Sequence, residues 1–406
     1  MRTLPTSCHV PAIPAGLALT GAAFSFTGVY LASGVLMPLL VLYQERWRLS
    51  AAQLTLAFAV FAIGFLAAVV TVGSLSDHVG RRPVLVGALI IQLTSNVLFF
   101  GASDVQWVIV ARIVQGIATG TATAAFTASL VEHAPPNRKR LGSILASVSL
   151  TGGLAAGSLL AGTAIQLTTA PNAIVFITLI VITALSVVVV ALSPETATRA
   201  PGALRSLIPR VAVPPPALTE FAAAVPVITA IWMLSGLAGG LAPSMVRSVF
   251  DLDSGLLNGL CGFLAPAASA LATLLFARLE DRRLMMVGIY ASIAGATGIA
   301  CGAMLGILVV MFVGQGVAGA GFGASFAASL RLVLPLAATH QRAAVAAAIY
   351  LVSYIAFGVP VVVAGRMTAC IGVVPTVICY SAASALLALA SLRAQSRLAR
   401  RATALN

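Results

Sequence analysis

Arg112 is the residue of this 406-residue chain that a purely structural role explains least well. It lies with Gln115 and Gly116 in the sequence RIVQGIATG, within an otherwise uncharged apolar run over 105–131. A guanidinium in such a run costs several kcal/mol unless it is paired or hydrated. A hydrated cavity, the Gln115 amide or an anionic ligand would offset that cost. The alternative is that Arg112 reaches the outer surface along its aliphatic stem.

A second group of chemically active residues is concentrated in GSLSDHVGRRP, a short stretch between two uncharged apolar runs. Asp77 and Arg81 lie one helical turn apart and can form an ion pair. Gly80 permits the chain to turn tightly between two helices. Asp77 could also face the N-terminus of another helix, a contact of about 0.3–2 kcal/mol. The simpler interpretation is that Arg81 and Arg82 only fix the orientation of the chain in a membrane.

Carboxylates and imidazoles, the usual proton carriers of membrane proteins, fall outside the middle of the apolar runs. An organic cation would therefore find no buried counter-charge, which disfavours cationic solutes. The proton carrier stays open between Arg112, Glu132 and Glu220. The five cysteines show no metal-ligand spacing, and GQGVAG at 314–319 lacks the acidic residue of a dinucleotide site. We expect no metal and no cofactor. The four histidines fall in expected inner loops or tails: His9, His78, His133 and His340.

The elements that must position these residues follow from composition. Charged residues make up 8% and hydrophobic residues 60% of the chain, and no soluble fold could cover so much apolar surface. The apolar runs approach or exceed the roughly 20 residues that a spanning helix needs, without the alternation of barrel strands. The sequence predicts an all-α membrane protein with twelve transmembrane helices, at 18–43, 52–75, 83–101, 105–131, 142–164, 172–193, 219–243, 256–277, 284–304, 307–335, 343–365 and 370–392.

Two helix starts have local signals. Ser50 and Gln53 fit a capping box for the second helix. Asp253 is placed to cap the eighth helix.

Lysine and arginine residues are distributed unevenly over the loops. With the N-terminus inside, only Arg46, Arg48, Arg247 and Arg366 fall in outer loops. This asymmetry is the positive-inside pattern and predicts that both termini are cytoplasmic. It also accounts for the net charge of +13 without a nucleic-acid partner.

The chain contains an internal repeat. VQGIATG at 114–120 matches GQGVAGA at 314–320, and GRR at 80–82 matches DRR at 281–283. Two copies of a six-helix unit form parallel repeats. We expect an N-terminal six-helix bundle at 1–193, a cytoplasmic linker at 194–218, a C-terminal six-helix bundle at 219–392 and a cytoplasmic tail at 393–406.

The stretch between the second and third helices resembles the signature of the major facilitator superfamily. The residues that carry this resemblance are Gly73, Leu75, Asp77, Gly80, Arg81 and Arg82. Twelve helices and two parallel halves with a long inner loop agree with it over the whole chain. In that family the motif holds the halves together on the inner side while the cavity faces outward. The resemblance therefore implies that Asp77 contacts the N-terminus of the eleventh helix during part of each transport cycle.

The resemblance also implies a solute site. RIVQGIATG is similar to a fourth-helix motif of the superfamily whose arginine is linked to proton coupling, and helices 1, 4, 7 and 10 line the family's central cavity. The residues implied for substrate binding or coupling are Arg112, Gln115, Gly116, Tyr30, Trp232 and Gln315.

A third, partial match lies in the fifth helix. Gly153, Gly157 and Gly162 partly resemble the Gly-Pro motif of proton-driven drug exporters, with Ser158 where those exporters have proline. Gly358 and Pro360 occupy the repeat-related segment of the eleventh helix. Small residues at this spacing also allow close helix packing, so a structural role is the alternative.

These features predict a secondary active transporter rather than an enzyme. It would move a small neutral or anionic, partly apolar metabolite or drug across the bacterial inner membrane by alternating access, with efflux by proton antiport favoured. The alternatives are uptake or facilitated passage of a small organic anion or sugar, and a non-transporting sensor or scaffold. We expect a monomer in membrane lipid, with protons as the coupling ion and no nucleic-acid partner.

Overall fold

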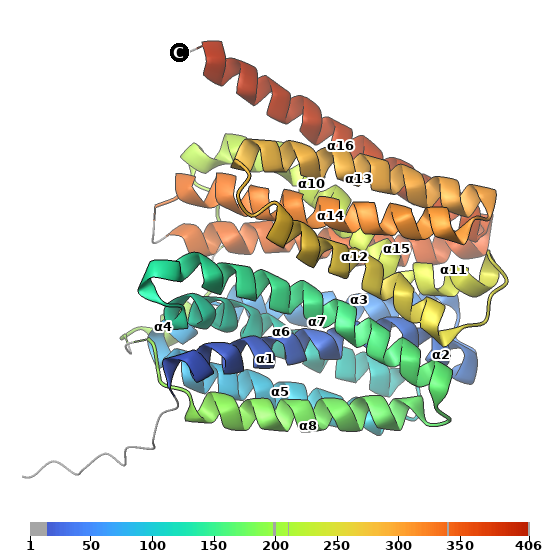
Figure 1. Ribbon diagram of the computed structural model, residues 1–406, viewed down its shortest axis with the longest axis horizontal. Coiled ribbons are helices and arrows are strands. Elements are labelled where there is room, and N and C mark those ends of the chain that lie inside the picture. Colours follow the sequence, from blue (N-terminus) through green and yellow to red (C-terminus); the bar gives the residue numbers. More distant parts are fainter. Residues whose placement is uncertain (1–13, 198–199, 210, 339–340, 405–406) are drawn as a thin grey trace, which may run out of the picture.

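The computed structural model describes residues 14–197, 200–209, 211–338 and 341–404, which fold into helices joined by short turns (Figure 1). Twelve segments are long and apolar enough to cross a membrane. They confirm the predicted all-α membrane protein with twelve spans. In chain order they are α1 (Ala15–Gly34) with α2 (Leu36–Trp47), α3 (Ala51–Val72), α5 (Arg81–Phe100), α6 (Val105–His133), η1 (Pro136–Arg138) with α7 (Lys139–Leu167), α8 (Pro171–Leu192), α10 (Pro215–Gly240), α12 (Gly255–Leu275), α13 (Asp281–Leu305), α14 (Leu308–Val333) with η2 (Leu334–Leu336), α15 (Arg342–Ile371) and α16 (Val373–Ala404).

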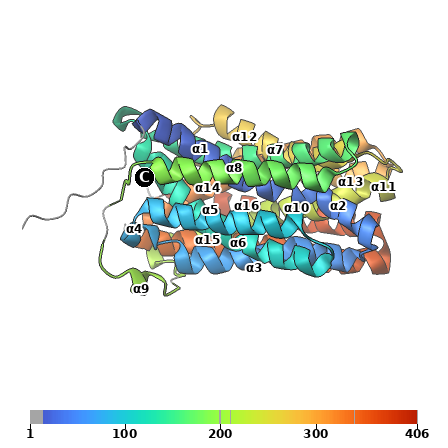
Figure 2. The same cartoon turned by 90° about the horizontal axis from the view of Figure 1, so that it is seen from below.

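Three short helices lie between the spans. They are α4 (Ser76–Val79), α9 (Ala203–Ser206) and α11 (Ala242–Ser248). Both α4 and α9 lie at one end of the bundle, together with the first residues of α1 (Figure 2). We call this the linker end. The opposite end, where α2 ends and α11 lies, is the far end.

The first span differs from the single segment predicted at 18–43. It is interrupted between Gly34 and Leu36 and extends to Trp47. Pro38 has no N–H that could bond the carbonyl of Gly34, so the helical hydrogen-bond ladder is broken at this point.

The C-terminal segment also differs from the prediction. The tail expected at 393–406 continues α16 as a helix to Ala404. Gln395 is 2% exposed and accepts a hydrogen bond from Arg282, which anchors the first turn of this extension to the bundle. Within the expected linker at 194–218, α9 is a single turn and α10 already begins at Pro215. Cys8, His9, Arg199, Arg210 and His340 lie outside the described residues.

The two predicted helix starts have different outcomes. Ser50 and Gln53 form the expected capping box at the start of α3. At α12 the cap is Ser254, whose hydroxyl accepts from Leu257 N at 3.3 Å, and not Asp253. The carboxylate of Asp253 instead lies 2.8 Å from the guanidinium of Arg247.

The spans form two halves that meet along two helix pairs. In one pair α3 packs against α15, and in the other α7 packs against α12. At the second contact a Cβ added to Gly162 would lie 2.6 Å from the Cα of Gly259. Only glycine permits backbones to approach so closely. The backbones of the two halves are therefore in direct contact along the seam between them.

Candidate solute site and conformational switch

Arg112 lies buried between α6 and α3, with 2% of its surface exposed. Its Nε donates to the carbonyl of Ala57 at 3.3 Å, and a terminal nitrogen donates to the carbonyl of Phe58 at 3.0 Å. The other terminal nitrogen donates to Gln115 Oε1 at 2.7 Å. All three acceptors are uncharged. Hydrogen bonds inside the protein, rather than exposure of the head group, offset the desolvation of this guanidinium.

The other site residues predicted in the N-terminal half join α6 to its neighbours. Gln115 Nε2 donates to the carbonyl of Ala32 in α1 at 2.8 Å. A Cβ added to Gly116 would lie 2.3 Å from the carbonyl oxygen of Phe61, so α6 touches α3 there. The hydroxyl of Tyr30 is 2.9 Å from that of Thr123. These predicted residues therefore do lie on adjoining faces of α1, α3 and α6.

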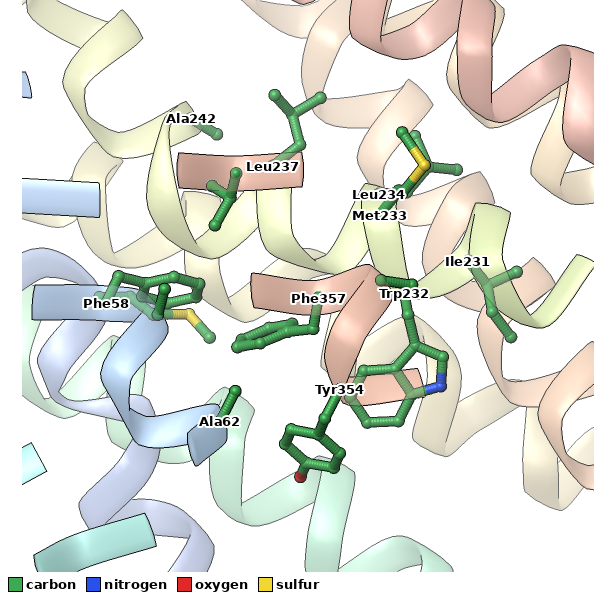
Figure 3. Close-up of a cluster of buried hydrophobic side chains, with 14 of the residues drawn as sticks. Phe58, Ala62, Ile231, Trp232, Met233, Leu234, Leu237, Ala242, Tyr354 and Phe357 are labelled. Atoms are coloured by element: carbon green, nitrogen blue, oxygen red, sulfur yellow. The ribbon is translucent and has the colours of Figure 1, made fainter. Parts of the chain in front are cut away.

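A continuous group of rings fills the seam beside Arg112. The guanidinium carbon of Arg112 lies 4.6 Å from the ring centroid of Phe61 and 5.7 Å from that of Phe58, which are cation–π distances. From these two residues the rings continue to Trp232 of α10 and to Tyr354 and Phe357 of α15 (Figure 3). Two rings of α14 pack against Trp232. We call this group the aromatic cluster; its members are Phe58, Phe61, Phe65, Trp232, Phe322, Phe326, Tyr350, Tyr354 and Phe357.

Trp232, predicted as a site residue, lies inside this cluster. Its ring centroid is 4.8 Å from that of Tyr354, 5.2 Å from Phe322 and 5.7 Å from Phe326. Trp232 is 9% exposed, and its Nε1 has no hydrogen-bond partner among the described residues. The N–H is therefore a buried donor available to a ligand.

Gln315, the repeat equivalent of Gln115, has a different environment. Gln115 Oε1 accepts from Arg112, but the corresponding position in α14 is Phe312. Gln315 is 1% exposed and its Oε1 has no donor within the described parts of the chain. The two halves therefore share a buried glutamine but only the first supplies its charged partner.

Sequence reasoning missed the rings contributed by α3 and α15. It considered only the first, fourth, seventh and tenth spans, whereas α3 and α15 are the second and eleventh. The signal was nonetheless present as helical spacing of aromatic residues, in Phe58, Phe61 and Phe65 and again in Tyr350, Tyr354 and Phe357.

The motif at the linker end forms a compact ion-pair group. Arg81 pairs with Asp77 one turn earlier and with Glu132 at the end of α6, the latter at 2.9 Å. Asp77 is 53% exposed. The described ion pair of Asp77 lies within its own half, and its implied contact with the N-terminus of α15 stays a prediction. Leu75 packs against the apolar core of the N-terminal half.

Glu195, which follows α8, closes the same motif from the linker side. Its carboxylate accepts from Arg81 N at 2.8 Å and from Arg82 N at 3.1 Å, the first two amides of α5. A carboxylate at this position accepts hydrogen bonds from N–H groups that have no partner within the helix. Its negative charge also interacts favourably with the helix dipole. Gly80 has φ +110°, and a Cβ there would lie 2.5 Å from Glu195 Oε2. Gly73 ends α3, and the turn between α4 and α5 favours glycine at 80 because of this positive φ.

The second half has an ion pair between the corresponding two spans. Asp281 at the start of α13 lies 3.4 Å from Arg331 near the end of α14. In the first half Arg81 and Glu132 join α5 to α6. The C-terminal half also has a pair in which the buried Glu220 of α10 accepts from the partly exposed Arg282 at 2.6 and 2.7 Å.

The far end is closed by contacts between the halves. Arg247 of α11 pairs with Glu45 of α2 and with Asp253. The hydrogen bond to Asp253 raises the pKa of the Arg247 guanidinium above its ordinary value. Nearby, a Cβ added to Gly365 of α15 would lie 2.2 Å from the hydroxyl of Thr55 in α3. By contrast, the ion pairs named at the linker end each stay within one half.

The helix-packing glycines serve two different contacts. Gly153 and Gly157 face α1, because an added Cβ would lie 2.6 Å from the carbonyl of Thr27 and 2.1 Å from that of Leu31. Gly162 faces α12 in the other half. Gly358 approaches α3 less closely, at 3.5 Å from Ala62 Cβ, and Pro360 lies inside α15 without ending it.

No group of three or more histidine, cysteine, aspartate or glutamate residues with metal-binding geometry occurs within the described ranges. The chemistry available at the seam is therefore ring stacking, hydrogen bonding and one buried cation.

Twelve spans, with buried polar side chains such as Arg112, Gln115 and Gln315 among them, define a multi-pass membrane protein with the fold of a transporter. The sequence pattern of the Major Facilitator Superfamily matches residues 22–360, and the chain belongs to that family. Its fold is that of transporters, not enzymes.

Solved structures agree with the family. A bacterial homolog of the human lysosomal transporter Spinster, in an inward-facing and unoccupied conformation, has a TM-score of 0.72 at 14% identity, over 96% of this chain and 98% of that one. The human organic anion transporter MFSD10 (TETRAN) has a TM-score of 0.63 at 17% identity, over 93% of this chain and 100% of that one. At these identities the likeness concerns the fold.

One curated relative matches over a short stretch. Multidrug resistance protein MdtL of Citrobacter koseri is 34% identical over 71 residues, which is 18% of each chain.

Proposed function

We propose that the protein is a secondary active transporter that exports a small, partly apolar, neutral or anionic solute by alternating access, with protons moving in the opposite direction. The observation that carries this proposal is the asymmetry of the seam. The far end is joined across the halves by Arg247 and Glu45, whereas the charged groups at the linker end pair within their own halves. Such a seam is one of the two states that alternating access requires.

The direction of transport is supported by two observations. The linker end carries exposed basic residues, including Arg138, Lys139 and Arg140, and such residues favour the cytoplasmic side of the bacterial inner membrane. With both termini on that side, a closed far end is an inward-facing state that can load solute from the cytoplasm. The partial match to a multidrug resistance protein also favours export.

Within this proposal the residues have separate roles. Trp232, Tyr30 and Gln315 contact solute, while Arg112 with Gln115 and Gly116 couples the solute site to the proton gradient. The motif from Gly73 to Arg82 is the switch that holds the linker ends together in the outward-facing state. The protein acts as a monomer in lipid.

A vesicle experiment tests the proposal. Inverted membrane vesicles containing the protein are energised to an acidic interior, and radiolabelled chloramphenicol is offered as a neutral probe beside salicylate as an anionic one. We expect accumulation of one probe that disappears when nigericin collapses the pH gradient. Accumulation equal to that of vesicles without the protein, for both probes, would reject it.

Uptake of a small organic anion is the second candidate, favoured by the buried Arg112 and by the similarity in fold to an organic anion transporter. It predicts the opposite vesicle result. Salicylate would accumulate in right-side-out vesicles and not in inverted ones.

A further inference from the structure

We propose that the aromatic cluster binds an uncharged, planar aromatic solute that accepts a hydrogen bond from Trp232 Nε1. This inference rests on the proposed transport function and narrows its solute from neutral or anionic to neutral and aromatic. Three features of the seam carry it: an unpartnered donor, rings in stacking geometry and the placement of the nearest charge.

The donor is the indole N–H of Trp232. Buried polar groups are almost always hydrogen-bonded, and a buried donor whose acceptor adjoins Trp232 follows that rule. Tyr380 OH donates to the carbonyl of Met233, the next residue of α10, at 3.0 Å. Trp232 Nε1 has no such acceptor among the described residues. An acceptor atom on a bound solute would supply it.

The rings around this donor can receive a flat molecule. Tyr354, Phe322 and Phe326 lie 4.8–5.7 Å from Trp232, centroid to centroid, in tilted or edge-on orientations. Aromatic pairs are favourable in such geometries, and a planar solute inserted among them would exchange ring–ring contacts for equivalent ring–solute contacts. The cluster as found is then the solute-free form of the site.

The charges near the cluster disfavour ionised solutes. An organic cation would meet no carboxylate among the cluster members, and the guanidinium of Arg112, which already lies over Phe58 and Phe61, would repel it. Arg112 is the cation in contact with the cluster, and its guanidinium donates hydrogen bonds to Ala57, Phe58 and Gln115. An anion beside Trp232 would lose its hydration without an ion-pair partner. A neutral ring with one acceptor fits these surroundings.

Access to the site is from the linker end. Phe326 and Tyr350, the rings nearest that end on α14 and α15, are only partly buried. Phe58 and Phe357, nearest the far end, are 2% and 8% exposed and pack against each other at 4.9 Å. A solute could reach Trp232 by passing Phe326 and Tyr350, and Phe58 with Phe357 would block its further movement toward the far end.

Four matched naphthalene-sized probes test the ligand class on purified protein in nanodiscs. Tritiated 2-acetylnaphthalene is the neutral probe with an acceptor, and scintillation proximity measures its binding above that of empty nanodiscs. The competitors are 2-ethylnaphthalene without an acceptor, 2-naphthoate as the anion and N-methylquinolinium as the cation. We expect 2-ethylnaphthalene to compete about tenfold more weakly than unlabelled 2-acetylnaphthalene. Neither ion should compete at comparable concentrations.

Trp232→Phe removes the N–H and keeps a ring. It should weaken binding of 2-acetylnaphthalene about tenfold and leave that of 2-ethylnaphthalene unchanged. Trp107→Phe is the matched control, because Trp107 is 47% exposed in the first turn of α6; it should bind both probes as the wild type does. If Trp232→Phe does not fold, the probe series on the wild-type protein still decides.

Two results would overturn the inference: stronger competition by 2-naphthoate or N-methylquinolinium than by the neutral ketone, or equal binding of both neutral probes. If vesicles transport chloramphenicol or salicylate while these binding tests fail, the inference about the solute class is rejected and the proposed transport function stands. If the ketone binds specifically but neither chloramphenicol nor salicylate is transported, the proposed function is rejected and the aromatic binding site stands.

Discussion

At the scale of single residues, Arg112 shows how the structure changes the sequence-based alternatives. The sequence left open an anion site, coupling and a surface position. In the structure the guanidinium is 2% exposed and bonded to neutral acceptors. These bonds define a fixed fork geometry that an ammonium group cannot reproduce.

Arg112→Lys is therefore expected to keep solute binding and to lose gradient-driven accumulation, because Arg112 holds α6 to α3 rather than contacting the solute. Equilibrium binding and energised uptake in vesicles would be measured on one preparation. Arg46→Lys, at an exposed far-end position, is the control. A half-saturation concentration that rises sharply in Arg112→Ala and partly recovers in Arg112→Lys would instead indicate direct binding of an anion. Variants that transport as the wild type does would contradict any functional role.

Asp77→Asn is expected to impair transport more than folding. Asp77 is half exposed and pairs with Arg81, and exposed pairs contribute only about 0–1 kcal/mol to stability. Thermal denaturation in detergent and transport at matched expression would be compared. A large fall in melting temperature, or full transport activity, would contradict the proposed switch.

Side-chain contacts in the candidate site could be predicted from the sequence where both partners lie in the same short stretch of chain. Arg112 with Gln115, and Asp77 with Arg81, are separated by one helical turn, so spacing alone brings them together. Glu195 and Tyr354 were missed because their partners lie on distant segments. The spacing of residues along one helix does not show which helix faces meet across the seam.

At the scale of helices, the number and order of the spans follow from the apolar runs, while their ends depend on tertiary contacts. α16 continues beyond the expected position because Gln395 meets Arg282. Ser254 caps α12 because Asp253 is engaged by Arg247. The first contact comes from a remote part of the chain, and the second from the short helix α11 just before α12.

The contact between α7 and α12 gives a prediction at this scale. Gly162→Ala should destabilise the protein, because the added Cβ would lie 2.6 Å from the Cα of Gly259 and the helices would have to separate. Gly152→Ala on the same helix has only Val148 near it, at 4.0 Å, and should be neutral or stabilising by up to about 1 kcal/mol. Melting temperatures of the two variants in one detergent provide the test. Equal melting temperatures would show that this backbone contact does not determine the stability of the protein.

At the scale of the whole molecule, the pair between Arg247 and Glu45 joins the two halves at the far end. Arg247→Gln should shift the population toward a state open at that end. The pair is nearly half exposed, so the shift should not exceed about fivefold, which corresponds to roughly 1 kcal/mol.

Spin labels at Asp104 and Gly306, on opposite halves in loops of the far end, would report the shift in a cysteine-free background. A new, longer distance should appear in Arg247→Gln. The control is Arg366→Gln, an exposed far-end arginine, which should leave the distance distribution as it is. If both variants resemble the unmutated chain, the far end is held closed by packing alone.

The ion pairs at the two ends have different consequences for a moving molecule. At the linker end Arg81 pairs with Glu132, and Asp281 pairs with Arg331, so both charges of each pair move together as parts of one half. At the far end Arg247 and Glu45 belong to different halves, so opening that end separates opposite charges. Dissolved salt screens exposed charges, so raising the ionic strength should ease the opening of the far end and leave the pairs at the linker end unaffected by the motion.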